Sequence, residues 1–129
     1  MDDKTLKALL GAQQGELDAV LMYQSIAKKI KNEEIKALIL DSAKDEGRHA
    51  SVFHKITKVD LKPKRTLAIV VPLLMSILGK KIVFKIIAKS EYGVKDSYEK
   101  LIPEFPEIAD VLKDEFKHGD RMLELSNKF

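Results

Sequence analysis

The sequence predicts an all-α protein, a four-helix bundle in which two antiparallel hairpins are joined by a long crossover. Proline and glycine are sparse, at 4 and 6 of 129 residues, whereas leucine, lysine, glutamate and alanine, which favour helices, abound. No run of alternating β-branched residues bounded by turn dipeptides predicts a strand. Apolar residues instead recur with the 3.6-residue period of a helix over four long stretches. The length fits one domain over residues 1–129.

The first predicted hairpin consists of a helix over about residues 3–31 and a second helix over about 33–59. Each helix carries an apolar stripe on one face, and ionisable residues interrupt both stripes. Glu16 lies on the first stripe, and Glu46 and His49 lie on the second. A carboxylate on an apolar face is costly unless it has a partner, so these residues are candidate ligands.

The second predicted hairpin begins with a helix over about residues 72–101, with Pro72 as its first residue and a bend allowed at Gly79. A turn that starts at Pro103 leads to a last helix over about 106–127. Apolar stripes again face inward and are again interrupted. The ionisable residues on these inner faces are Glu91, Glu115 and His118.

One motif therefore occurs in both hairpins, Glu-x6-Tyr followed by Asp-Glu-x-x-His. Its first copy is Glu16, Tyr23, Asp45, Glu46 and His49, and its second copy is Glu91, Tyr98, Asp114, Glu115 and His118. Residues i and i+3 lie on one face of a helix, so each Glu-x-x-His can contact one ion. A Glu from each of two helices, with Glu-x-x-His from each of two others, is the ligand set of di-iron carboxylate bundles. The sequence thus predicts a metal site built from two glutamates and one histidine of each copy.

The spacing of the carboxylates favours this pairing. Glu16 and Glu46 are each 15 residues from the middle of the first predicted turn, and in the second hairpin both glutamates are 12 residues from Pro103. Equal arms of an antiparallel hairpin bring two residues to one level. The alternative is a buried salt-bridge network, but the stripes offer almost no lysine or arginine to neutralise the carboxylates. Six nitrogen and oxygen ligands without sulfur suit two iron ions, and manganese would fit the same set.

Residues beside the ligands have two interpretations each. Asp45 and Asp114 either accept a hydrogen bond from a ligand histidine and so orient its ring, or are solvated acids. Tyr23 and Tyr98 either support a ligand carboxylate and take part in catalysis, or are ordinary core tyrosines. Four glycines lie within two residues of a ligand: Gly15, Gly47, Gly93 and Gly119. Close approach of two helices, an entry path for a small molecule, or chance would explain them.

The absence of cysteine excludes disulfides, thiolate catalysis and iron–sulfur or rubredoxin-type centres in this chain. It fits a reducing compartment, and the acidic N-terminus lacks the layout of a signal peptide, so we expect a cytoplasmic protein. A net charge of +3 is too small to predict nucleic-acid binding.

The crossover is the most unusual segment in composition. Residues 55–89 carry a net charge of +8, against −5 for the rest of the chain. Within them, 67–78 is an apolar run of 12 residues, too short to span a bilayer. Either the run is a buried helix or a dimer interface, or it contacts an anionic membrane peripherally. We expect residues 66–90 to make an intermolecular or membrane contact, and the protein to be a homo-oligomer.

The duplicated motif resembles the rubrerythrin-type ferritin-like family, and the resemblance extends from Glu16 to His118. It implies a ferritin-like bundle with a di-iron centre. In that centre, Glu46 and Glu115 would bridge the irons, and Glu16 and Glu91 would be terminal ligands. Each of the two motif histidines would bind one iron.

The sequence departs from that family at three points. Val94 stands where rubrerythrins proper carry an extra glutamate, and their cysteine-rich rubredoxin domain is absent. The apolar, basic crossover resembles ferritin-like domains fused to vacuolar-iron-transporter-type membrane proteins.

Three hypotheses for the function follow. The first is reduction of hydrogen peroxide or dioxygen with electrons from a separate donor protein. The second is a ferroxidase for iron storage or delivery, and the third is a metal-stabilised adaptor bundle without turnover.

Overall fold

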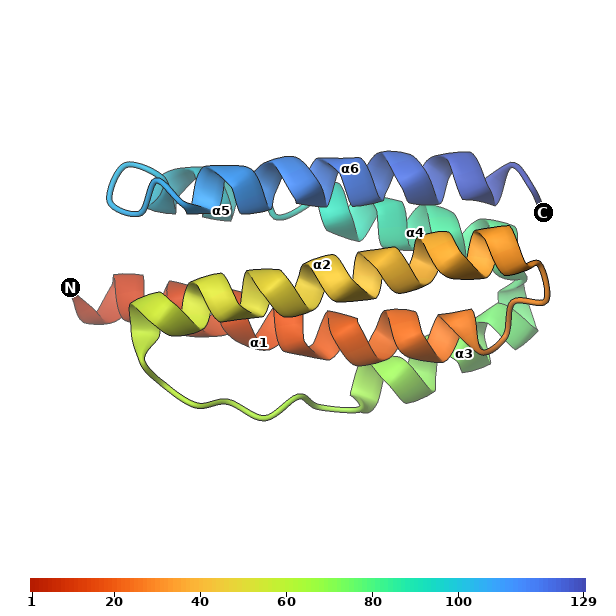
Figure 1. Cartoon of the computed structure of the whole chain (residues 1–129), viewed down its shortest axis with the longest axis horizontal. Helices are drawn as coiled ribbons and strands as arrows, with labels where there is room; N and C mark the ends of the chain where they lie inside the picture. The colour runs from red at the N-terminus through yellow and green to blue at the C-terminus, as the bar shows by residue number, and fades with distance from the viewer. The chain divides into compact units, whose positions relative to one another are not determined.

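The computed structural model describes all 129 residues and is all-α, which confirms the predicted class (Figure 1). The helices are α1 (Asp3–Ala27), α2 (Glu33–Thr57), α3 (Thr66–Leu78), α4 (Lys80–Tyr92), α5 (Lys95–Leu101) and α6 (Ile108–Ser126). The chain divides into two compact units, residues 1–72 and 73–129, each of which is described in turn. A single domain over the whole chain stays a prediction.

In the first unit, α1 and α2 form the predicted antiparallel hairpin (Figure 1). Side chains cap both helices at their N-termini: Asp2 accepts a hydrogen bond from the Thr5 N–H at 2.7 Å, and Asn32 accepts one from the Ile35 N–H at 3.0 Å. The helices are a few residues shorter than predicted. The largest apolar side chains buried in this hairpin are Leu9, Tyr23, Ile26, Ile39 and Phe53.

The segment after α2 is tied back to α1. Lys58 adopts the left-handed conformation, with φ 60°, and ends α2. The Asp18 carboxylate then accepts a hydrogen bond from the Lys64 N–H at 2.7 Å, and Gln14 Nε2 donates to the Lys62 carbonyl at 2.9 Å. These bonds hold the basic segment along α1 and deliver the chain to the start of α3.

The prediction of one long helix over 72–101 was wrong, because the chain forms three helices there. The first of them, α3, begins at Thr66, so Pro72 lies inside a helix instead of opening one. Proline lacks the N–H that would donate to the carbonyl four residues earlier, that of Ala68. The Ser25 hydroxyl of α1 donates to that carbonyl instead, at 2.6 Å, so the acceptor is satisfied.

Two breaks separate α3 from α4 and α4 from α5. Gly79 has φ +88°, a conformation that favours glycine, so α3 ends there and α4 starts anew. The second break lies at Gly93 and Val94, where the Gly93 N–H is shared between the carbonyls of Lys89 and Ser90. The predicted bend at Gly79 is therefore a full interruption, and a further one follows Tyr92.

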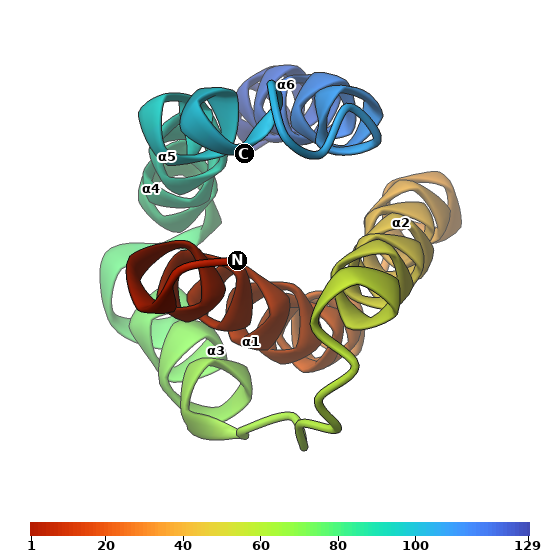
Figure 2. The ribbon, with the colours of Figure 1, turned by 90° about the vertical axis from the view of Figure 1, so that its left-hand side faces the viewer.

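In the second unit, α6 packs against α4 and α5 to form the second predicted hairpin (Figure 2). The turn over residues 102–107 contains both prolines, and the Phe105 N–H donates to the Leu101 carbonyl at 2.9 Å. Helix α6 begins at Ile108 instead of the predicted 106. The apolar side chains buried in this hairpin include Val83, Phe84, Ile87, Ile108, Val111, Met122 and Leu125.

Candidate metal centre

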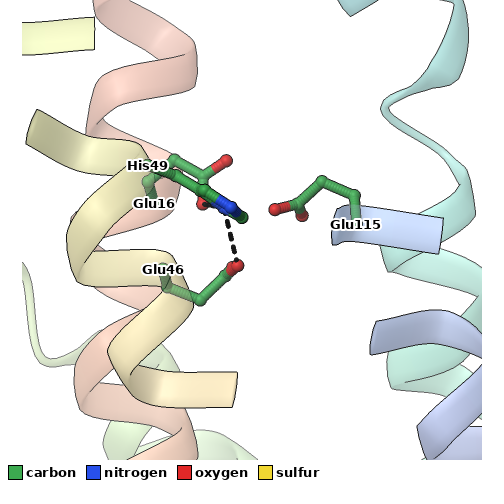
Figure 3. Close-up of side chains that lie close together, drawn as sticks. All are labelled: Glu16, Glu46, His49 and Glu115. Atoms are coloured by element: carbon green, nitrogen blue, oxygen red, sulfur yellow. Dashed lines mark ion pairs between the residues drawn. The ribbon is translucent and has the colours of Figure 1, made fainter. Parts of the chain in front are cut away.

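The first hairpin buries a cluster of two carboxylates and one imidazole (Figure 3). Glu16 comes from α1, and Glu46 and His49 come from consecutive turns of α2. His49 Nδ1 lies 3.2 Å from Glu46 Oε1 and 3.5 Å from Glu16 Oε2. All three residues are only 2% exposed, and one ligand atom of each lies within 4.8 Å of the others.

The second hairpin buries the matching cluster. Glu91 lies in the last turn of α4, and Glu115 and His118 lie on α6. These residues are at most 6% exposed, and one ligand atom of each again lies within 4.8 Å of the others. His118 Nδ1 is 3.9 Å from Glu91 Oε2. Each hairpin therefore holds the same set of three donors.

Hairpin geometry explains both clusters. Equal distances from the turn bring the two glutamates of a hairpin to one level, and the i, i+3 spacing adds the histidine to the same face. The breaks around α4 leave this arrangement intact, because Glu91 precedes the break at Gly93. The sequence thus predicted correctly which side chains meet within each hairpin.

The chemistry of the donors fits a metal ion. Neighbouring ligand atoms around one first-row ion, at bond lengths of about 2.1 Å, are roughly 3 to 3.5 Å apart. The two distances from His49 Nδ1 fall in that range. Two carboxylates and one imidazole are donors that iron and manganese accept, and neither cluster contains a sulfur ligand. The donors of each cluster are therefore suited to an ion, and the distances of the first cluster already match one; the 3.9 Å from His118 Nδ1 to Glu91 Oε2 in the second is longer.

The residues predicted beside the ligands occupy varied surroundings. Asp45 accepts a hydrogen bond from Arg48 Nη2 at 2.9 Å on the same helix, and Asp114 is half-buried on α6. Tyr23 and Tyr98 are both buried, at 0% and 5% exposed. A role for either aspartate toward a ligand histidine, and a catalytic role for either tyrosine, stay predictions.

Sequence reasoning missed a contact that joins the two ligand-bearing helices of the second hairpin. Tyr92 follows Glu91 in α4, and its hydroxyl donates a short hydrogen bond to Asp120 of α6. Its ring meets Phe116 edge-on, with centroids 5.6 Å apart, and lies over Gly119. Partial burial, and then the bond to Asp120, raise the pKa of Tyr92 to about 12, so the hydroxyl remains a donor at neutral pH.

This contact gives Gly119, one of the four glycines beside ligands, a packing role. A Cβ at position 119 would lie 2.6 Å from Cε1 of Tyr92, so the ring would have to move. Gly15, by contrast, has nothing within 4 Å of such a Cβ. Close helix approach therefore explains Gly119, and the only sequence signals were a glycine beside one ligand and a tyrosine beside another.

Gly119→Ala should lower the free energy of unfolding of the metal-free protein by about 1 kcal/mol. Displacing the Tyr92 ring costs about 1–3 kcal/mol as overpacking and lost contacts, and alanine's better helix propensity offsets part of that. Chemical denaturation followed by circular dichroism measures the change.

A matched substitution separates the two effects. Gly11→Ala, in α1 with open space around the new Cβ, should raise stability by about 0.5–1 kcal/mol. In a Tyr92→Ala background, Gly119→Ala should also become stabilising, because the ring that it displaces is gone. A Gly119→Ala that stabilises the parent protein would show that the ring does not hold the helices together.

The fold and the two clusters define a class: helical hairpins that carry the donors of di-iron carboxylate proteins. Comparison with protein families then identifies the chain more closely. The model of the rubrerythrin family matches residues 7–126, nearly the whole chain, so the chain belongs to the rubrerythrin family. Comparison with curated proteins and with solved structures gave no match.

Proposed function

We propose that the protein is a di-iron redox protein of rubrerythrin type that reduces hydrogen peroxide, or dioxygen, with electrons from a separate donor protein. The observation that carries the proposal is the pair of buried clusters, one per hairpin, with identical donors. Membership of the rubrerythrin family supports the choice of iron. The absence of cysteine from the chain supports an external donor.

The six ligands would hold the two metal ions in different ways. By the family's pattern, Glu46 and Glu115 would be the ligands shared by both ions, Glu16 and Glu91 would each hold one ion, and each histidine would bind one ion. Four ionised glutamates would offset the charge of two ferrous ions, so the loaded, reduced centre would be close to neutral in a buried setting. When bound, the iron pair would supply the electrons that reduce the oxidant.

The chain controls the surroundings of that chemistry. The ligands are nearly inaccessible to water. An oxidant at the centre would therefore be surrounded by the ligand side chains and not by bulk solvent. The two clusters are equivalent in donors, with a histidine in each. Val94 offers no extra carboxylate next to Glu91. We infer that the ligand set changes little between oxidation states.

The test is the reaction of anaerobic, Fe(II)-loaded protein with each oxidant. Stopped-flow absorbance of the ferric product should rise faster with hydrogen peroxide than with dioxygen at equal concentration. Electron balance requires about one peroxide per two Fe(II) ions, each peroxide taking up two protons to form two waters. The equivalence of the two clusters is the reason for this expectation.

Two controls define the result. Fe(II) in buffer without protein gives the background rate, and Glu46→Ala, which should not retain the iron, should return the rate to that background. Faster oxidation by dioxygen, with accumulation of many irons per chain, would contradict peroxide reduction and favour a ferroxidase. Retained metal without oxidation by either reagent would favour a structural adaptor.

A further inference from the structure

Helix α3 is apolar all round but is covered on one side only. None of its 13 residues is charged. The buried residues follow the helical period on one face: Ala68, Val71, Pro72 and Met75. The exposed apolar residues, each between 41% and 69% exposed, are Leu67, Ile69, Val70, Leu73, Ile77 and Leu78. A helix that is hydrophobic all round is normally buried in a protein core or in a membrane, so this exposed face requires a partner.

The start of α3 is held in place by α1, so this exposure is a property of the fold and not of a loose segment. Figure 2 shows the first part of α3, residues 66–72, alongside α1, where the Ser25 hydroxyl donates to the Ala68 carbonyl at 2.6 Å. The residues just before α3 are fixed as well, through the bond between the Lys64 N–H and Asp18. The exposed side chains of this first part of the helix, residues 66–72, therefore lie on the side away from α1.

The charges around α3 have one sign. Residues 61–90 contain no aspartate or glutamate. Their cations are Lys62, Lys64 and Arg65 before the helix, and Lys80, Lys81, Lys85 and Lys89 after it. All of them except the half-buried Lys80 are exposed. An apolar helix with cations at both ends is suited to a surface that is negatively charged outside and apolar beneath.

We propose that the uncovered face of α3, defined by its six exposed apolar residues, docks in the plane of an anionic lipid membrane. The apolar side chains enter the boundary between headgroups and acyl chains, and the flanking cations contact the acidic headgroups. At about 1.5 Å per residue, the helix offers a contact roughly 20 Å long. None of the helices has the length and hydropathy that a membrane span needs.

The same charges disfavour a second copy of the chain as the partner. In a two-fold dimer, the same patch of both subunits meets itself. Packing α3 against its symmetry mate would place cationic segments next to one another. No acid within residues 61–90 is present to neutralise them. Anionic lipid neutralises the cations and covers the apolar side chains together.

Vesicle flotation tests the proposal on the whole chain. The protein should float with vesicles of phosphatidylcholine containing about 30% phosphatidylglycerol, and should bind far less to phosphatidylcholine alone or at about 0.5 M salt, where charges are screened. The double variant Ile69→Glu/Ile77→Glu should reduce the bound fraction by about tenfold or more. Leu123→Glu, at an exposed leucine of α6, is the matched control and should bind as the parent does.

A fluorescence measurement keeps the test independent of the charged variants. The chain contains no tryptophan, so Leu73→Trp introduces a single probe at an exposed position of α3. Its emission should shift to the blue on adding anionic vesicles, whereas that of Leu123→Trp should not. Absence of both flotation and the shift would overturn the proposal. The proposal would also be overturned if the parent protein were a dimer that does not bind vesicles and if the double variant were a monomer. A second copy of the chain would then cover the face. Iron content is measured separately, so neither outcome depends on the redox activity.

Discussion

Protein reconstituted with Fe(II) and desalted should retain about two iron ions per chain, and Glu46→Ala or Glu115→Ala should retain few. Both glutamates are buried, and by the family's pattern they would be the ligands shared by both ions. Loss of a shared ligand weakens two sites together. Glu16→Ala removes a ligand from one ion and should therefore leave more iron bound than Glu46→Ala. Elemental analysis of iron against protein concentration measures the ratio.

The controls for this ratio come from the same chain. Glu104→Ala removes an exposed acid from the turn before α6 and should leave the iron content unchanged. His118→Ala and His49→Ala should resemble each other, because the two clusters have the same donors. A parent protein that retains no iron, or one ion per chain, would contradict the assignment of one di-iron centre.

The parts of the fold that the sequence predicted depend on local periodicity. The stripes of α1, α2 and α6 follow a 3.6-residue period, and ligand positions follow from counting along each hairpin from its turn. The same arithmetic placed Glu16 beside Glu46 and His49, and His49 Nδ1 lies 3.2 Å from Glu46 Oε1 and 3.5 Å from Glu16 Oε2. Periodicity and turn position were sufficient for these features because each hairpin is antiparallel with a short turn.

The features that the sequence did not predict depend on residues far apart in the chain. A proline in a helical stretch often marks the first residue of the helix. Helix α3 instead continues through Pro72, because Ser25, in another helix, satisfies the Ala68 carbonyl. The packing of Tyr92 over Gly119 likewise joins α4 to α6. Neither partnership leaves a periodic signal. The break at Gly79 was predicted as a bend, since its positive φ is visible only in the structure.

Replacing a buried ligand should make the variant more stable than the parent without metal, and less stable than the parent with metal. The first cluster buries two carboxylates and one imidazole between α1 and α2. Glu46→Leu removes one of these buried carboxylates and replaces it with apolar volume. Such replacements are often stabilising by about 1–4 kcal/mol, so the metal-free variant should unfold at a higher denaturant concentration than the metal-free parent.

With metal, the parent should be the more stable protein. Binding to the folded state alone adds about 2.7 kcal/mol when free metal is a hundredfold above its Kd, and the variant loses most of that increment. Denaturation with chelator and with excess Fe(II), under anaerobic conditions, gives both comparisons in one experiment. Glu104→Leu, at an exposed position, should change stability by less than about 0.5 kcal/mol in either condition. A Glu46→Leu variant that is less stable than the parent without metal would show that this carboxylate stabilises the fold itself. Selection for metal binding would then not be needed to explain why a carboxylate is buried between α1 and α2.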